Sequence, residues 1–294
     1  MKRLALIAAL PACAWAHTGE PLEPHDLWTA WEFDPGVVIP LALAAMLYAL
    51  GARRSRGIRP WEASCFWAGW VTLVIALASP VHPMGEALFS AHMTQHELLM
   101  VIAAPLLVLG RPMIPFLWGL PLRWRQRIGA VTKTRPVQRA WRWLTLPAAA
   151  WIVHAIVLWG WHMPPLFQAT LTSDLVHSAQ HISFLFSALL FWWAVLHGRE
   201  GHMGYGKSVL YIFTTAIHTS ILGALLTFSP ALWYPAYANT TQAWGLSPLE
   251  DQQLGGLIMW VPAGLTYVIA GLALIAGWLK ESELRVLARE GERA

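Results

Sequence analysis

The stretch LFSAHMTQHELLMVIAAPLLVL, residues 88–109, decides the fold of this chain. Glu97 is its one acidic residue, and its length matches the roughly 20 residues that an α-helix needs to cross the hydrocarbon core of a bilayer. It also carries the pattern His-x-x-Gln-His, as His92, Gln95 and His96. The stretch therefore predicts a membrane-spanning helix with two histidines near one end.

The whole chain has the composition of an integral membrane protein. Only 12% of its residues are charged, against about a quarter in soluble domains, and it contains 19 tryptophans. Apolar runs like the first recur along the sequence, at residues 37–50, 61–79, 147–161, 175–196, 206–228 and 255–279. We therefore expect an all-α bundle of seven transmembrane helices, in which the first and fourth runs need flanking residues to span.

The basic residues predict the orientation of this bundle. Of the 20 basic residues, all except Lys2 and Arg3 lie in residues 53–59, 111–142, 199–207 or 280–293. These segments follow the first, third, fifth and seventh apolar runs. The positive-inside rule then places the N-terminus outside and the C-terminus in the cytoplasm. The net charge of +4 is thus a topology signal, and no nucleic-acid partner is expected. The basic, aromatic segment 122–128 is expected to lie on the anionic leaflet of the lipid bilayer.

The N-terminus has the layout of a secretory signal peptide. Lys2 and Arg3 precede a short apolar stretch, and Ala14-Trp-Ala16 fits a cleavage site. We predict a signal at residues 1–16, a periplasmic segment at 17–36, the membrane domain at 37–280 and a cytoplasmic tail at 281–294, in a bacterial-type plasma membrane. Lipidation at Cys13 is an alternative.

A second His-x-x-Gln-His pattern, at His177, Gln180 and His181, opens the fifth run. Histidines four residues apart share one helix face, so both imidazoles of each pair can reach one metal ion. Two such pairs at matching depth predict a metal site formed by His92, His96, His177 and His181. The alternative is ordinary hydrogen bonding between helices, as polar residues in membranes show.

Other histidines map close to this site or deeper in the membrane. His17, His25, His82 and His162 fall on the outer side, and cleavage after Ala16 would let the free amine and imidazole of His17 chelate Cu(II) with His25. His154 and His218 lie deeper; His154 is ~12 Å further in than His162 at the rise of an α-helix. Accessory binding and a structural role both remain open for these deeper residues.

The ligand types point to copper. The two cysteines, Cys13 and Cys65, cannot form a thiolate cage or an internal disulfide in the mature chain. Met100 follows His92 and His96 on one helix face, and imidazole with thioether suits copper, particularly Cu(I), whereas imidazole alone also suits zinc. Plain packing is the alternative for Met100.

Carboxylates and amides near the pairs could support the ligands. Glu97 and Asp174 could accept a hydrogen bond from the second nitrogen of a ligating imidazole, as could Gln95 and Gln180, and so fix the tautomer. Asp174 also suits a helix start, where it would cap the helix. Glu97 would have to accept its hydrogen bond from a residue of another helix, because adjacent residues of a helix point in different directions and Glu97 points away from His96.

Three motifs in order resemble the CtaG-type cytochrome c oxidase assembly factors. They are HMTQHELLMVIAAPLLVLGRP at residues 92–112, WGWHMPPLF at 159–167, and VHSAQH at 176–181 before FWW at 191–193. The resemblance implies seven membrane helices and a role in assembling haem-copper oxidase through delivery of copper. It carries over His92, His96, His162, His177 and His181 as candidate ligands.

We therefore expect an outward-facing copper site that receives the ion, as Cu(I) or Cu(II), from a periplasmic donor and passes it to an oxidase subunit. This is binding and transfer without enzymatic turnover. One alternative is copper transport across the membrane through His154 and His218, and another is a di-haem cytochrome with axial histidines. A zinc hydrolase using Glu97 as a base ranks last, because the chain lacks the His-Glu-x-x-His order.

Overall fold

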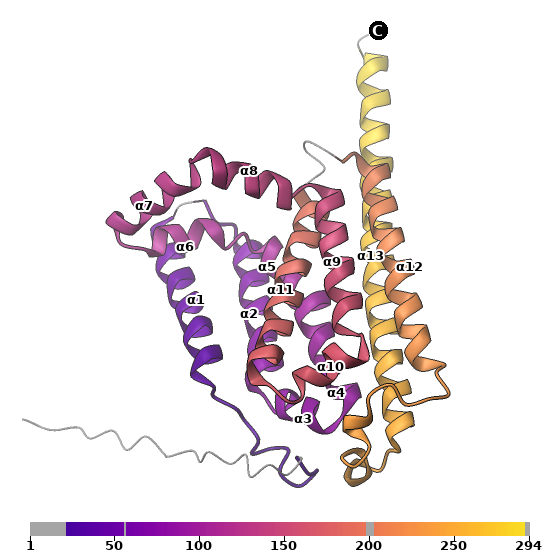
Figure 1. Cartoon of the computed structure of the whole chain (residues 1–294). Helices are drawn as coiled ribbons and strands as arrows, with labels where there is room; N and C mark the ends of the chain where they lie inside the picture. The colour runs from indigo at the N-terminus through magenta and orange to yellow at the C-terminus, as the bar shows by residue number, and fades with distance from the viewer. Residues whose placement is uncertain (1–21, 56, 198–202, 292–294) are drawn as a thin grey trace, which may run out of the picture.

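The computed structural model describes residues 22–55, 57–197 and 203–291, and within these ranges every regular element is helical (Figure 1). The predicted signal peptide, which contains Cys13, lies outside the described residues, as does His17. The elements are α1 (Pro35–Arg54), α2 (Pro60–Ala78), α3 (Val81–Ala87), α4 (Phe89–Glu97), η1 (Leu98–Ala103), α5 (Ala104–Leu109), α6 (Met113–Gly119), α7 (Leu122–Thr132), α8 (Arg135–Leu144), α9 (Pro147–Trp161), α10 (Pro164–Thr170), α11 (Asp174–His197), α12 (Tyr205–Thr227), η3 (Pro235–Tyr237), η4 (Thr241–Trp244) and α13 (Pro248–Gly291).

The long helices account for most of the predicted membrane spans. Within the described ranges, six helical segments are long and apolar enough to cross a bilayer: α1, α2, the continuous stretch from α4 to α5, α11, α12 and α13. A seventh is reached only if α8 and α9, bent by 68° at their junction, count as one span. The all-α membrane fold is confirmed, and the count is six or seven. Apolar side chains such as Ile156, Ile182 and Val268 face outward, as lipid contact requires.

The last helix differs from its predicted bounds at both ends. Helix α13 begins at Pro248, where Glu250 Oε2 accepts a hydrogen bond from Ser247 N and Ser247 Oγ accepts one from Glu250 N. This reciprocal pair is a capping box, which fixes the helix start. At the other end the helix continues through the predicted tail to Gly291. Within this extension, an ion pair between Glu281 and Arg285 joins successive turns.

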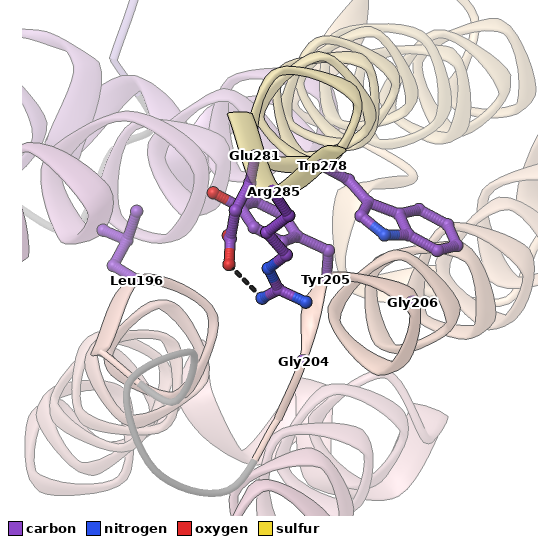
Figure 2. A pocket seen from close by; sticks show the side chains of 7 residues that line it. All are labelled: Leu196, Gly204, Tyr205, Gly206, Trp278, Glu281 and Arg285. Atoms are coloured by element: carbon purple, nitrogen blue, oxygen red, sulfur yellow. Dashed lines mark hydrogen bonds and ion pairs between the residues drawn. The ribbon is translucent and has the colours of Figure 1, made fainter. Parts of the chain in front are cut away.

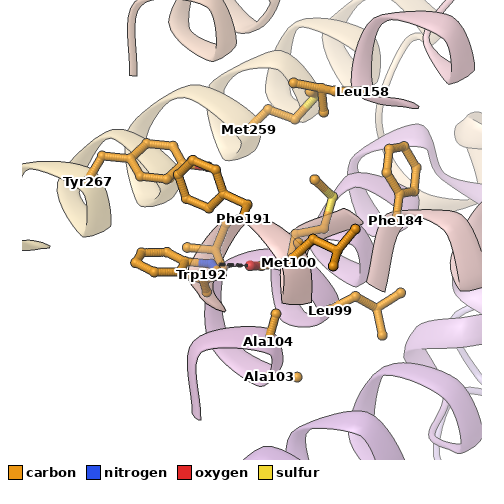
Figure 3. Packing of buried hydrophobic residues seen from close by; sticks show 14 of the residues in the cluster. Leu99, Met100, Ala103, Ala104, Leu158, Phe184, Phe191, Trp192, Met259 and Tyr267 are labelled. Carbon is orange, nitrogen blue, oxygen red and sulfur yellow. Dashed lines mark hydrogen bonds between the residues drawn. The ribbon is translucent and has the colours of Figure 1, made fainter. Parts of the chain in front are cut away.

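The helices with the histidine pairs form the centre of the bundle. Within the most apolar 18-residue stretch of each segment, 61% of the third span and 56% of α11 are buried, against 11% of α1 at the edge. Figure 3 shows the apolar core between them, where Trp192 of α11 donates a hydrogen bond from Nε1 to the carbonyl oxygen of Met100 at 3.0 Å. Met100 lies in η1, a π-helical turn directly after α4. A widened turn of this kind is frequent near functional sites.

The two ends of the bundle differ in character. At one end, which we call the histidine end, lie α3, α10 and the first turns of α4 and α11 (Figure 1). At the opposite end, the basic end, α7 and α8 run across the bundle without a buried residue. The helix α7 contains the predicted amphipathic segment 122–128. The positive-inside rule favours the basic end as cytoplasmic.

Candidate metal centre

Six histidine side chains lie together at the histidine end. The closest ring centroids are 4.3 Å apart for His177 and His181 and 4.5 Å apart for His92 and His96, the two pentapeptide pairs. The pairs also meet each other, since His92 lies 5.2 Å from His177 and His96 lies 5.7 Å from His181. The structure thus brings together the four histidines from the two pentapeptides. The other two members are His82 of α3 and His162, which follows α9.

In two groups of three histidines, the ring nitrogens lie close enough together to hold one metal ion. In each group, one nitrogen per residue lies within 4.8 Å of the corresponding nitrogen of the others. One group contains His92, His96 and His181, and the other contains His82, His177 and His181. A metal about 2.0–2.1 Å from each imidazole nitrogen spans such separations with small side-chain movements.

The nitrogens of this cluster suit a cation. Except for His82, its side chains are 8% exposed or less. Several buried nitrogens lack a hydrogen-bond partner among the described residues: His92 Nδ1, both nitrogens of His96, and Nε2 of His162, His177 and His181. Because a buried polar atom without a partner destabilises the fold, such a concentration is unusual in a core that is only structural. The residues therefore fit a bound metal ion.

The pentapeptide glutamines act on histidines of other helices. Gln180 Oε1 accepts a hydrogen bond from His92 Nε2 at 3.1 Å, which leaves the lone pair of a neutral His92 on Nδ1. Gln95 Nε2 donates to the carbonyl oxygen of Ala76 at 2.7 Å and contacts His82 Nδ1 at 2.8 Å. The glutamines therefore orient imidazoles, as second-sphere groups do in metal sites.

His162 is oriented by its own helix. Its Nδ1 donates to the carbonyl oxygen of Leu158 at 2.6 Å, so the lone pair of the neutral ring is on Nε2. Burial lowers the pKa of His162 to about 4, since the charged form loses its hydration. The ring therefore stays neutral at physiological pH. Its centroid lies 6.1 Å from that of His96, beside the two groups rather than within either.

Contacts from the connection between α12 and α13 hold the backbone around the cluster. The Tyr237 hydroxyl donates to the carbonyl oxygen of Gly85, and the Tyr234 hydroxyl donates to that of His162, both at 2.8 Å. Burial raises the pKa of both phenols, so the hydroxyls remain protonated donors.

The buried carboxylate of Asp251, on α13, holds the start of α4. It accepts hydrogen bonds from the backbone N–H groups of Phe89 and Ser90 and from the Ser90 hydroxyl. These N–H groups are unpaired by the helix itself, so Asp251 acts as an N-cap supplied by another helix. Gly255 of α13 permits the close approach, because a Cβ there would lie 2.4 Å from the Phe89 ring.

The comparisons with known proteins agree with this architecture. The family model for the cytochrome c oxidase caa3 assembly factor matches residues 46–281, which include all six clustered histidines. The chain belongs to this family. The predicted resemblance to CtaG-type assembly factors is therefore confirmed.

Similar curated proteins come from mycobacteria. Uncharacterized proteins of Mycobacterium bovis and Mycobacterium tuberculosis are each 29% identical over 285 residues, and one of Mycobacterium leprae is 27% identical over 284 residues. These alignments cover 90–91% of this chain but 42% of each relative. The chain thus spans less than half the length of these relatives. No solved structure matches the chain.

The accessory residues proposed from the sequence lie apart from the two three-histidine groups. His25 is exposed and lies 3.3 Å from Glu23 and 3.4 Å from Asp26. Asp174 is exposed as the first residue of α11, where a carboxylate complements the helix dipole. Neither Glu97 nor Asp174 belongs to the metal-ligand groups found among the described residues.

The remaining candidates lie deeper. Met100 packs in the apolar core of the bundle (Figure 3). The ring of His154 stacks on Phe191, and its Nδ1 lies 3.3 Å from Ser187 Oγ. His218 Nδ1 accepts a hydrogen bond from Trp159 Nε1 at 3.4 Å. His82 was not predicted to belong to the site, although its predicted position on the outer side is the same as that of the other clustered histidines.

A separate pocket lies at the basic end. Figure 2 shows it between the start of α12 and the extension of α13, with Tyr205, Trp278 and the ion pair of Glu281 and Arg285 among its lining residues. Its volume is about 610 Å³. None of the clustered histidines lines this pocket, so it is not part of the candidate metal centre.

Proposed function

We propose that this member of the caa3 assembly factor family takes up copper at the clustered histidines and hands it to a subunit of cytochrome c oxidase during assembly. The observation that carries the proposal is the group of buried imidazole nitrogens without hydrogen-bond partners. Membership of an oxidase assembly family supplies the biological setting. The ion is cargo, and no substrate is turned over.

The ligand set suits transfer better than permanent storage. Both three-histidine groups consist of imidazoles alone, without the thiolates that are common in closed structural metal sites. Imidazole ligands suit copper, and a three-ligand shell leaves a position open for a ligand from the recipient. The distribution of basic residues favours a periplasmic position for the histidine end, where a periplasmic donor could load it.

The experiment measures metal in the purified full-length protein after loading with Cu(I) and removal of excess ion. We expect the wild-type protein to retain copper and the His92→Ala/His181→Ala variant to lose most of it, because His181 belongs to both three-histidine groups. His197→Ala is the matched control, because His197 lies at the other end of α11. Equal copper in the wild-type protein and the double variant would refute the proposal. Loading with Zn²⁺ in parallel tests the preference for copper.

Transport of copper across the membrane is a second candidate. His154 and His218 lie nearer the middle of their helices, and Nε2 of each is buried without a hydrogen-bond partner in the described part of the chain. Transport predicts that copper enters sealed vesicles containing the protein and that His154→Ala abolishes this uptake. Assembly alone predicts no uptake, with normal copper binding by the same variant.

A further inference from the structure

The two three-histidine groups share one residue. His181 belongs to both the group with His92 and His96 and the group with His82 and His177. A neutral imidazole has one nitrogen lone pair, so His181 can bind only one ion at a time unless it loses a second proton. The groups are therefore alternative positions for one ion rather than two independent sites.

The groups differ in their access to the surface. The His82 side chain is 17% exposed, whereas His92 is fully buried and His96 is 3% exposed. His177 and His181 are intermediate, at 8% and 7%. An ion from outside would therefore meet the group containing His82 first. We call this group the uptake position and the group of His92, His96 and His181 the inner position.

The groups also differ in the hydrogen bonds that an ion must displace. At the uptake position, His82 Nδ1 contacts Gln95 Nε2 at 2.8 Å, and its Nε2 lies 3.4 Å from the Glu32 carboxylate. Binding through either nitrogen gives up one of these contacts. At the inner position, His96 has no hydrogen bond to lose within the described residues. The inner position should therefore bind more tightly, and the uptake position should exchange faster.

We propose that His82 forms the uptake position of the metal centre, from which one copper ion passes to His92 and His96 while His181 stays bound to it. Each step exchanges one imidazole for another at the ion, so no change of oxidation state or proton donor is required. Keeping His181 as a common ligand avoids releasing the ion during the transfer. This inference rests on the proposed copper-binding function.

The experiment compares four full-length proteins in detergent: wild type, His82→Ala, His96→Ala and the double variant. Cu(I) is supplied as its bicinchoninate complex, whose colour reports both the affinity and the rate of transfer. We expect one ion per wild-type chain. His82→Ala should keep the affinity within roughly threefold but load at least about tenfold more slowly. His96→Ala should still bind one ion, roughly tenfold more weakly, because binding at the uptake position displaces a hydrogen bond of His82. The double variant should bind none.

Two controls separate ligation from structure. His82→Gln keeps a polar side chain beside Gln95 but is a poor copper ligand, so it should load as slowly as His82→Ala. His197→Ala should behave as the wild type. Unchanged loading by both His82 variants would overturn the inference and leave the proposed function intact. Equal loss of affinity in His82→Ala and His96→Ala would also overturn it, in favour of one undivided site. A wild-type protein that binds no copper would overturn the proposed function itself.

Discussion

Asp251 allows a quantitative prediction about how the metal centre is held. Its carboxylate is fully buried and accepts hydrogen bonds from two backbone N–H groups and one hydroxyl at the start of α4. That start lies less than one turn before His92, the first residue of the pentapeptide. Loss of the carboxylate should therefore weaken both the fold and copper binding.

The size of the effect follows from the groups left behind. Asp251→Ala leaves the N–H groups of Phe89 and Ser90 buried, and each unpaired group costs about 1–3 kcal/mol, so the free energy of unfolding should fall by about 2–6 kcal/mol. Ser90→Ala removes only the hydroxyl and its one hydrogen bond, which should cost about 1 kcal/mol. Asp251→Asn keeps an acceptor oxygen but loses the charge at a helix N-terminus, so an intermediate loss is expected.

Unfolding in mixed detergent and sodium dodecyl sulfate, followed by far-ultraviolet circular dichroism, measures this series. Glu283→Ala is the control, because Glu283 is exposed on the same helix and should change stability by less than about 0.5 kcal/mol. Copper affinity should fall in the same order as stability. The reasoning fails if Asp251→Ala unfolds at the same detergent ratio as Ser90→Ala, since the backbone N–H groups would then have found other partners.

Three further predictions concern the surroundings of the cluster. Gln180→Leu should lower copper affinity by roughly 10–100-fold with little effect on folding, as measured by chelator competition, because His92 loses the group that orients it. Tyr237→Phe should destabilise the protein by about 1 kcal/mol in the same unfolding assay, since it removes one hydrogen bond to Gly85. Because the pKa of buried His162 is lowered to about 4, the unfolded state binds its proton first, and the free energy of unfolding should fall between about pH 6.5 and pH 4. Titrating His162→Phe in parallel should show a shallower fall.

Hydropathy was sufficient to predict most of the fold. Residues 147–161 form α9 as predicted, α11 extends one residue beyond its apolar run at each end, and α12 is shifted by one residue from its run. The agreement is close because exclusion of polar backbone from lipid determines where such helices lie. Helix α13 was predicted poorly, because the apolar run marks only the part within the bilayer. The capping box Ser247-Pro-Leu-Glu250 was readable in the sequence and would have given the correct start.

The candidate site could be predicted only in part. The helical repeat places His92 with His96 and His177 with His181, since residues four apart share a face. No local pattern places His82 beside His177, because their contact depends on how the short helix α3 packs between the long helices. The N-cap that Asp251 provides for α4 also could not be predicted from the sequence, because it joins residues more than 150 positions apart.

The unpaired nitrogens have a consequence for stability that connects the fold to the proposed function. Each polar atom buried without a partner lowers the free energy of unfolding by about 1–3 kcal/mol. An ion that binds these atoms only in the folded protein offsets part of this loss. At a free copper concentration 100 times the dissociation constant, stabilisation should reach about 2.7 kcal/mol. His181→Ala should abolish this gain, because it removes the ligand common to both positions, while His197→Ala should keep it. If copper stabilised His181→Ala as much as the wild type, the ion would bind elsewhere, and the partnerless nitrogens would need another explanation.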